Sequence, residues 1–241
     1  MGKTAIIIPA RYSSTRLPGK PLIKVKGKPI IWWVYERANQ SKLADKVIVA
    51  TDDVRIFNSI NGFGGNVCMT SPDHQSGSDR IAEIVRKNED IDIAVNVQGD
   101  EPMLNPDSID KAIKCLLEDE RADIATLIRK IHDKEEVQNP NLVKVVIAND
   151  GRALYFSRSP IPYPRKEEFA VYYGHVGLYA FRREALLKMT ELPQTDLEKV
   201  ECLEQLRALQ NGLVIKTAEI NYAPTGIDTP EDLERFRTCV E

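Results

Sequence analysis

The sequence predicts an α/β fold in which helices cover both faces of a mostly parallel β-sheet. Short apolar runs alternate with segments of helical periodicity through the first half of the chain. Such alternation is typical of βαβ units, which build parallel, Rossmann-like sheets. The 241 residues, 42% of them hydrophobic, suffice for one large domain with a sizeable core. We therefore expect a single domain over residues 1–241, with no linker that divides it.

The elements of the first half follow one another in regular order. The tripeptide Thr-Asp-Asp at residues 51–53 has the composition of a helix N-terminus. The expected elements are a strand at residues 5–8, a helix at 29–38, a strand at 47–50 that leads into this helix start, a helix at 78–85 and a strand at 93–97.

The pattern changes after about residue 140. Two strands, at residues 143–148 and 153–158, flank Asp150-Gly151, which is a strong signal for a hairpin turn. Residues 172–181 predict another strand. We interpret residues 140–185, roughly, as a smaller antiparallel lobe that covers the site or builds a dimer interface.

Two helices are expected near the C-terminus. The first, at residues 197–211, would end at Gly212. The second, at residues 230–240, has Thr229 as its cap and a proline at its first position. Asp232 stands where a capping box has Glu or Gln, so the box is only approximate.

The composition argues against several classes of protein. A net charge of -3 lacks the basic footprint of general nucleic-acid binding. No apolar stretch approaches the roughly 20 residues needed to cross a bilayer, and the short run at residues 5–8 is no signal peptide. The four cysteines form no metal-binding pattern and are expected to be reduced thiols. We expect a cytoplasmic protein that binds neither nucleic acid nor membrane.

Basic residues gather in the loop that follows the first predicted strand. Arg11, Arg16 and Lys20 are separated by small polar residues, and such a loop can wrap a polyphosphate. It is not a Walker A loop, because Pro21 follows the lysine and position 14 is serine. A G-x-G-x-x-G fingerprint is also absent. From spacing alone, phosphate binding and an ordinary charged loop are about equally supported.

Two acids stand where a metal ion could bind. Asp100 follows the apolar run at residues 93–98, and open α/β sheets bind ligands just beyond the carboxyl ends of their strands. Asp228 lies between a turn and the last helix. Mg²⁺ takes one or two carboxylates and completes its shell with water and phosphates. The two acids can meet only through the fold, so an ordinary strand-end acid and an ordinary helix-start acid remain open interpretations.

Three polar groups in the second half could contact a ligand. One begins a rigid, proline-rich segment, one is a His–Tyr pair on one face of a strand, and one is a polar helix face suited to a polyhydroxylated ligand. The residues alone favour plainer interpretations, namely a connector, a half-buried strand and a solvated face. The groups are, in this order, Arg158 within residues 157–165; His175 and Tyr179; and Glu201, Glu204 and Gln205, which lie broadly opposite Val200, Leu203, Leu206 and Leu209.

Short motifs extend over nearly the whole chain, from Ile6 to about Phe236. They are Ile8-Pro-Ala-Arg11, Ser14-Thr-Arg-Leu-Pro-Gly-Lys20, Ser76-Gly-Ser-Asp-Arg80, Asn96-Val-Gln-Gly-Asp-Glu-Pro102, Tyr155-Phe-Ser-Arg-Ser-Pro-Ile-Pro162, His175-Val-Gly-Leu-Tyr179, Leu203-Glu-Gln-Leu-Arg207 and Gly226-Ile-Asp-Thr229. Together they resemble the family of 3-deoxy-manno-octulosonate (Kdo) cytidylyltransferases. The first three are shared loosely with other sugar nucleotidyltransferases, whereas the motifs at residues 155–162, 175–179 and 203–207 are specific to the Kdo branch.

The resemblance implies a fold of the nucleotide-diphospho-sugar transferase type and a reaction that joins CTP to Kdo with release of pyrophosphate. It also implies Mg²⁺ as cofactor, a homodimer with residues 160–179 near the interface, and a place in lipopolysaccharide synthesis. The roles it implies are as follows: Arg11, Lys20, Asp100 and Asp228 as the catalytic group; Asp100 and Asp228 as metal ligands; Arg11, Lys20 and Arg16 at the triphosphate; Ala10, Ser71, Gly77, Arg80 and Gln98 at the cytidine; and Arg158, His175, Tyr179, Glu201 and Gln205 at the sugar acid.

Departures from the family pattern are small and concern only loop details. Ser13 stands where relatives often carry alanine, and residues 223–225 lie in a variable region. Two related substrates remain as alternatives, 8-amino-Kdo and a sialic acid, although sialic-acid enzymes tend to have a more glycine-rich first loop. A non-catalytic nucleotide-sugar binding protein is a more distant alternative, because a binding module need not keep two metal-binding acids.

Overall fold

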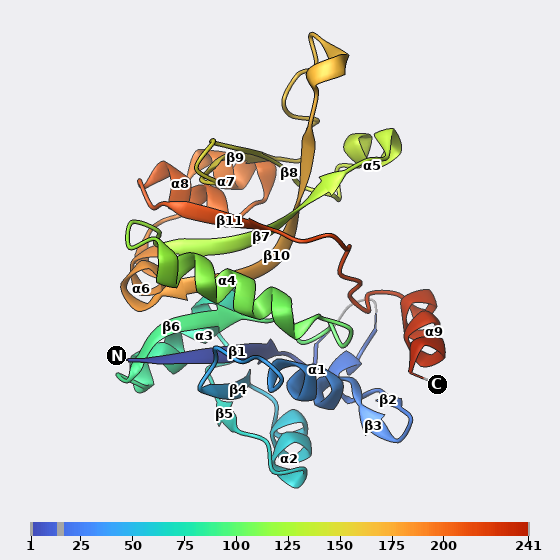
Figure 1. The fold of residues 1–241 in the computed structure, drawn as a ribbon. Helices are drawn as coiled ribbons and strands as arrows, with labels where there is room; N and C mark the ends of the chain where they lie inside the picture. The colour runs from blue at the N-terminus through green and yellow to red at the C-terminus, as the bar shows by residue number, and fades with distance from the viewer. Residues whose placement is uncertain (1, 14–16, 241) are drawn as a thin grey trace. The chain divides into compact units, whose positions relative to one another are not determined.

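The computed structural model describes residues 2–13 and 17–240. The chain forms two compact units, one from Met1–Asp110 with Pro224–Glu241 and the other from Lys111–Ala223. Figure 1 colours these parts by residue number, so the C-terminal part of the first unit is red and the rest is blue to green. Helix α4 (Pro106–Glu118) carries the chain from the first unit into the second.

The first unit contains a parallel sheet of the kind the alternation predicts. Its strands are β1 (Lys3–Ala10), β4 (Lys46–Thr51), β5 (Val67–Met69) and β6 (Ile91–Asn96), in the order β6-β1-β4-β5. β1 pairs in parallel with both β4 and β6, so the three strands end at one edge. Ile6, Ile7 and Ile8 in β1 are fully buried, which explains the uninterrupted apolar run. The strands predicted from residues 5–8, 47–50 and 93–97 are confirmed.

Helices pack on this sheet where the sequence predicts them. α1 (Ile30–Ala38) contacts β1 and β4, α2 (Val54–Gly62) contacts β4 and β5, and α3 (Gly77–Lys87) contacts β1, β4 and β6. Asp53 caps α2 by accepting a hydrogen bond from the backbone N–H of Arg55. Ser76 and Asp79 form a complete capping box on α3. The short elements η1 (Lys20–Leu22), β2 (Lys24–Val25) and β3 (Lys28–Pro29) lie between β1 and α1 in the chain.

The C-terminal helix α9 (Pro230–Cys239) belongs to the first unit and packs on α1. The ring of Phe236 meets Trp33 edge to face, with centroids 5.8 Å apart. Thr229 and Asp232 form a full capping box, so aspartate performs here the task that the sequence pattern assigns to Glu or Gln. This packing brings the segment that contains Asp228 back to the first unit.

The second unit contains a mixed sheet. β11 (Ile215–Glu219) runs parallel to β7 (Ile124–Ile131), and β10 (Tyr172–Arg182) runs antiparallel to β7. β8 (Lys144–Ile147) pairs antiparallel with β10 and with β9 (Ala153–Ser157). The predicted hairpin around Asp150-Gly151 is therefore confirmed, and the antiparallel strands β8, β9 and β10 fall within the range proposed for the lobe.

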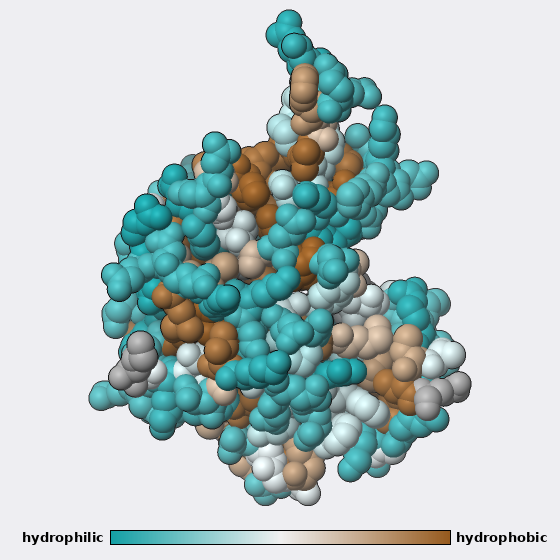
Figure 2. All heavy atoms as spheres, viewed as in Figure 1, coloured by the Kyte–Doolittle hydropathy of each residue, from teal (hydrophilic) through white to brown (hydrophobic). Residues whose placement is uncertain are grey.

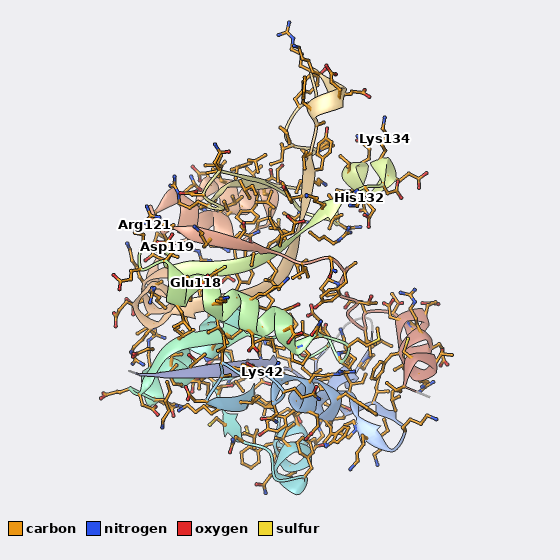
Figure 3. All side chains as sticks on the ribbon, in the orientation of Figure 1. Lys42, Glu118, Asp119, Arg121, His132 and Lys134 are labelled. Carbon is orange, nitrogen blue, oxygen red and sulfur yellow. The ribbon has the colours of Figure 1, made fainter. Side chains whose placement is uncertain are left out.

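The helices of the second unit are short. They are α5 (Lys134–Gln138), η2 (Glu167–Phe169), α6 (Arg183–Glu191), α7 (Asp196–Glu201) and α8 (Gln205–Gln210). α6 contacts β10, and α8 contacts β9. The end of α4 is tied to β11 through Asp119 (labelled with Arg121 in Figure 3), whose carboxylate accepts hydrogen bonds from Arg121 and, at 3.2 Å, from Lys216. These hydrogen bonds hold the pKa of Asp119 well below its usual value.

The prediction of one continuous helix at residues 197–211 is wrong. The chain breaks at Cys202, which adopts a left-handed conformation with φ of 51°, and the helix restarts at Gln205. A buried ion pair between Glu198 and Arg207 spans the break and favours it over a straight helix. The break also changes which residues are buried. Val200, expected on the apolar face, is 81% exposed, whereas Gln205, expected on the polar face, is only 7% exposed.

The surface is largely hydrophilic over the face drawn in Figure 2. This agrees with a sequence in which 29% of the residues are charged. Among the described residues, no helix combines the length and the apolar character that crossing a membrane would require.

Candidate active site

A cleft of about 470 Å³ opens in the first unit where β1 and β6 end. Its walls come from four segments that are distant in the sequence, and all belong to the first unit. Ligands of open α/β sheets bind in this position, beyond the carboxyl ends of the strands. The lining residues are 9–11, 13, 20, 21, 75, 77, 98–100 and 228.

Gly99 lets two of these segments approach closely. A Cβ atom at this position would lie 3.0 Å from the carbonyl oxygen of Pro9, which is tighter than an ordinary contact with backbone. The backbone N–H of Val97 donates to the carbonyl of Ile7 at 3.2 Å and continues the strand pairing up to this point. The glycine therefore allows the segment with Asp100 to turn beside the start of the basic loop.

Lys20, Asp100 and Asp228 converge in the cleft. The ammonium group of Lys20 donates to Oδ2 of Asp100 at 2.7 Å and to Oδ1 of Asp228 at 3.0 Å. The side chains are 11%, 33% and 46% exposed, respectively, so the lysine is the buried member of the group. Two acids that lie far apart in the sequence thus meet at one cation. The sequence alone could not establish whether they meet.

Local backbone contacts fix the three side chains. The N–H of Ile227 donates to the carbonyl of Asp100 at 2.8 Å, which joins the two acidic segments directly. The N–H of Asp228 donates to Oδ2 of Asp232 at 3.1 Å, so the cap of α9 also orients this acid. Gly19, with φ of 68°, precedes Lys20 and turns the chain into η1.

The electrostatics of the cleft keep Lys20 charged. Burial lowers its pKa, but the hydrogen bonds and charges of Asp100 and Asp228 act in the opposite direction, and the resulting pKa lies above the usual value of 10.5. Next to it, burial and the charge of Asp100 raise the pKa of Glu101 to about 7. The cleft therefore holds a permanent cation between two carboxylates.

The donor set suits Mg²⁺. Both carboxylates already converge on one cationic group, and Mg²⁺ binds through one or two carboxylates plus water and phosphate oxygens. Within residues 2–13 and 17–240, no cluster of three or more His, Cys, Asp or Glu side chains suitable for a metal occurs. An ion here would depend on substrate phosphates for the rest of its shell.

Most of the residues predicted to bind CTP lie in the cleft. Ala10, Arg11, Lys20, Gly77 and Gln98 line the cleft. Ser71 and Arg80 are not among the lining residues. Arg16 lies outside the described residues.

Arg80 and Ser71 instead make contacts with neighbouring segments of the first unit. Arg80 is fully buried, and its guanidinium group pairs with Asp52 at 2.8 Å and donates to the hydroxyl of Thr70. Its Nε has no hydrogen-bond partner among the described residues. The backbone N–H of Ser71 donates to Glu83 at 2.9 Å. The contacts of Arg80 with Thr70 and of Glu83 with Ser71 connect α3 to the segment that follows β5.

The residues predicted to bind the sugar acid all belong to the second unit. The rings of His175 and Tyr179 are in contact, with centroids 5.3 Å apart, so the pair shares one face of β10 as predicted. The hydroxyl of Thr126 lies 3.0 Å from Nε2 of His175 and 2.9 Å from the carbonyl of Leu178. If the hydroxyl donates to that carbonyl, Nε2 of His175 donates to the hydroxyl and Nδ1 remains as an acceptor.

Burial controls the protonation of this ring pair. It lowers the pKa of His175 to about 4, so the imidazole is neutral at pH 7. Burial, and to a smaller extent the charge of Glu204, raise the pKa of Tyr179 above its usual value. The pair therefore offers neutral hydrogen-bonding groups to a ligand.

Arg158 and Glu201 form a second group in this unit. The carboxylate of Glu201 accepts hydrogen bonds from the hydroxyl of Ser157 at 2.6 Å and from the N–H of Arg158 at 2.9 Å. The guanidinium group of Arg158 donates to the carbonyls of Glu201 and Pro140 at 2.7 and 3.0 Å. Gln205 follows on α8, and its buried Nε2 has no hydrogen-bond partner among the described residues.

Comparison with known proteins decides the family. A family model described as cytidylyltransferase matches residues 5–219. A 3-deoxy-manno-octulosonate cytidylyltransferase from Escherichia coli is 47% identical and covers 100% of this chain and 97% of its own. Another from Aliivibrio fischeri is 50% identical and covers 98% of both chains. This chain belongs to the 3-deoxy-manno-octulosonate cytidylyltransferase family.

A solved structure supports both the family and the fold. The structure of CMP:2-keto-3-deoxy-manno-octonic acid synthetase complexed with CTP has a TM-score of 0.95 at 47% identity, and the match covers 99% of this chain and 98% of that one. The resemblance seen in the sequence motifs is thereby confirmed, and so is the expected α/β architecture. The chain is an enzyme of the nucleotidyltransferase class.

The structure of the present chain also reveals candidate site residues beyond those that the sequence motifs indicated. Gln75 and Pro21 line the cleft, and Ser13 does so too. Glu204, which the sequence indicated only as part of a polar helix face, raises the pKa of Tyr179 through its charge. Gln75 lies between Ser71 and Gly77, two residues that were expected at the nucleotide, so its position in that segment was an available signal. The position of Glu204, immediately before α8, could not be predicted, because helical periodicity does not reveal the break at Cys202.

Proposed function

We propose that this enzyme transfers CMP from CTP to the anomeric 2-hydroxyl of Kdo, giving CMP-Kdo and pyrophosphate, with Mg²⁺ held by Asp100 and Asp228. The observation that carries the proposal is the convergence of these two acids on Lys20 in a cleft at the strand ends. Family membership supplies the identity of the substrates, since the relatives are named for Kdo and the similar solved structure contains CTP.

The first unit would bind the nucleotide. Arg11 and Lys20 line the cleft and carry positive charge, so they would hold the triphosphate and stabilise the charge that grows on the departing pyrophosphate. Arg16, from the same basic loop, would assist. Ala10, Gly77 and Gln98 also line the cleft and would contact the cytidine, and Ser71 and Arg80 would support this part of the site through their contacts with Glu83 and Thr70.

The second unit would bind the sugar acid. Neutral His175 and Tyr179 would exchange hydrogen bonds with hydroxyl groups, and Gln205 offers a buried amide donor. Arg158 and Glu201 would contribute a guanidinium group and a carboxylate. His175 is assigned a sugar contact and no general-base role, because burial lowers its pKa to about 4 and makes the imidazole a weak base.

The chemistry is an in-line displacement at the α-phosphorus without a covalent enzyme intermediate. The 2-hydroxyl of Kdo attacks while pyrophosphate leaves. Both substrates are anions, so Arg11 and Lys20 must offset their repulsion before positioning can accelerate the reaction. When bound, Mg²⁺ would neutralise phosphate charge and lower the pKa of the attacking hydroxyl.

The cellular setting follows from this reaction. CMP-Kdo is an activated sugar for lipopolysaccharide synthesis, and we place the enzyme in the cytoplasm, where CTP is available. We also propose that it acts as a homodimer with residues 160–179 near the interface.

Release of pyrophosphate from CTP and Mg²⁺ tests the proposal, with Kdo, 8-amino-Kdo and N-acetylneuraminate assayed in parallel. We expect release with Kdo and much slower release with the other two acids. Preference for 8-amino-Kdo or N-acetylneuraminate would keep the reaction and change the substrate. No release from folded protein with any acid would favour a non-catalytic nucleotide-sugar binding protein instead.

A further inference from the structure

Helix α3 holds the loop of residues 71–76, which connects β5 to this helix. Oε2 of Glu83 accepts a hydrogen bond from the N–H of Ser71 at 2.9 Å and lies 2.5 Å from Nε2 of His74. One turn earlier, Arg80 donates to the hydroxyl of Thr70, the residue that immediately precedes this loop. Two side chains of one helix therefore fix the loop at its beginning and at its middle.

The loop in turn holds an arginine of the nucleotide cleft. The guanidinium group of Arg11 donates to the backbone carbonyl of His74. Arg11 and Gln75 both line the cleft, whereas Glu83 and His74 do not. The side chain of Gln75 folds back onto the loop and donates to the carbonyl of Asp73 at 2.9 Å. A continuous set of contacts thus runs from Glu83 through His74 to Arg11.

The charge of Glu83 makes this connection strong. Burial raises its pKa, but hydrogen bonds from Lys87, His74 and Ser71 outweigh that effect and hold the pKa at about 2. An ionised carboxylate can only accept, so Nε2 of His74 carries the proton between the two groups. The side chains of Glu83 and His74 are 19% and 18% exposed, so solvent screens this contact only in part.

We propose that Glu83 is a positioning residue for the triphosphate, because through His74 it sets the backbone carbonyl that orients Arg11 in the cleft. Glu83 itself is an anion outside the lining of the cleft, so a direct contact with a phosphate is excluded by charge and by position. The inference rests on the proposed function, in which CTP is the nucleotide substrate.

A purely structural role for Glu83 predicts something different. Loss of a surface contact would lower the melting temperature and leave the affinity of the folded protein for CTP unchanged. A positioning role predicts weaker CTP binding with an unchanged KM for Kdo, because the sugar acid is assigned to side chains of the other unit. A change in CTP affinity without a change in the KM for Kdo therefore distinguishes a positioning role from a purely structural one.

The experiment measures CTP affinity by titration calorimetry and both KM values by pyrophosphate release, for the full chain and three variants. Glu83→Ala should weaken CTP binding about tenfold, which is the effect of about 1.4 kcal/mol. Glu83→Gln should recover much of that loss, since its amide oxygen can still accept from Ser71 and His74. Lys87→Ala is the matched control, because Lys87 is 58% exposed and contacts only the other oxygen of Glu83, Oε1. It should bind CTP within about twofold of wild type.

Two results would overturn the inference: Glu83→Ala binding CTP like the wild type, or the KM for Kdo rising as much as that for CTP. If Glu83→Ala does not fold, His74→Ala decides, since it removes the ring and keeps the carbonyl. It should weaken CTP binding and leave the KM for Kdo unchanged, and unchanged CTP affinity would count against the connection. A wild-type protein that fails to bind CTP would contradict the proposed function instead, so the two failures are distinguishable.

Discussion

Single side chains in this enzyme have functions that depend on protonation, and His175 shows the principle. Its ring lies against Phe156 and Tyr179, with centroids 5.1 and 5.3 Å away. In that setting the charged imidazolium would lose hydration without gaining a carboxylate, so burial lowers the pKa to about 4. A neutral ring suits a contact with sugar hydroxyls, and it also couples the stability of the fold to pH.

We predict that His175→Gln reduces the loss of stability in mild acid. The unfolded chain binds a proton at His175 near pH 6.5, whereas the folded chain does so only near pH 4, so protons favour unfolding as the pH falls through this window. At pH 5.5 the wild type should lose about 1.4 kcal/mol from this group relative to pH 7.5. Urea unfolding of both proteins at the two pH values measures the difference. An equal loss in wild type and variant would show that His175 is not held neutral.

At the scale of elements, the break between α7 and α8 positions two of the side chains that we propose as sugar ligands. Glu201 ends α7 and Gln205 begins α8, so their separation depends on the left-handed residue Cys202. The pair of Glu198 and Arg207 closes the break with hydrogen bonds of 2.8 and 2.5 Å, and the side chains are only 5% and 10% exposed. A buried pair of this kind defines one geometry more than it adds net stability.

We predict that Arg207→Met destabilises the protein by about 3 kcal/mol, because it leaves the carboxylate of Glu198 buried without its cation. The double variant Glu198→Met/Arg207→Met should regain much of that stability. Both variants should raise the KM for Kdo, since the break loses its closing contact. Chemical unfolding and pyrophosphate-release kinetics measure these effects.

The exposed pair of Lys114 and Glu118 supplies the control for Arg207→Met. These side chains are 64% and 66% exposed and 3.4 Å apart, so Lys114→Ala should change stability by less than about 0.5 kcal/mol. Similar losses in Arg207→Met and Lys114→Ala would contradict the assignment of a buried structural pair.

At the scale of the whole molecule, the two predicted sets of ligand-binding residues belong to two compact units. The residues proposed to bind the nucleotide belong to the first unit, and those proposed to bind the sugar acid belong to the second. The segment between β9 and β10 adds a further feature, because it exposes large apolar side chains. Tyr163, Phe169 and Val171 are 87%, 74% and 50% exposed. Apolar side chains that gather on one exposed segment are typical of an interaction surface, and this segment overlaps the region expected near the dimer interface.

We predict that the protein sediments as a dimer at micromolar concentration and that Phe169→Asp shifts it toward monomer. A charge would have to be buried in the interface without a partner, which disfavours association. Val54→Asp is the control, because Val54 is also apolar and 61% exposed but lies on α2. A wild type that is monomeric at all concentrations, or equal effects of the two variants, would contradict the predicted interface.

Much of this fold could be predicted because local patterns and tertiary packing agree in the first unit. The apolar runs of β1, β4 and β6 are buried strands, and the caps at Asp53 and Thr229 begin helices as their sequences indicate. β5 escaped prediction because it has only three residues and none of them is fully buried. β7 and β11 were not identified, and the break at Cys202 was missed because a tertiary ion pair overrides helical periodicity.

The candidate site was less accessible to sequence reasoning than the fold. The motifs supplied the residue identities, but only the fold brings Asp228 to Asp100 and Lys20. Arg80 was expected at the cytidine, and in the structure it is fully buried, pairs with Asp52 and is not among the residues that line the cleft. The role of the loop at residues 71–76 in holding Arg11 left no mark in the sequence, because it acts through a backbone carbonyl.

The most direct test of the account is the rate of pyrophosphate release from CTP and Kdo as a function of Mg²⁺ concentration, for wild type and Asp100→Asn. We expect that the wild type requires Mg²⁺ and that the variant loses at least about 100-fold in rate while its circular dichroism spectrum is unchanged. The loss follows from removing one of the two carboxylates that converge on Lys20. A variant that turns over at the wild-type rate, or a wild type that is indifferent to Mg²⁺, would contradict the central claim.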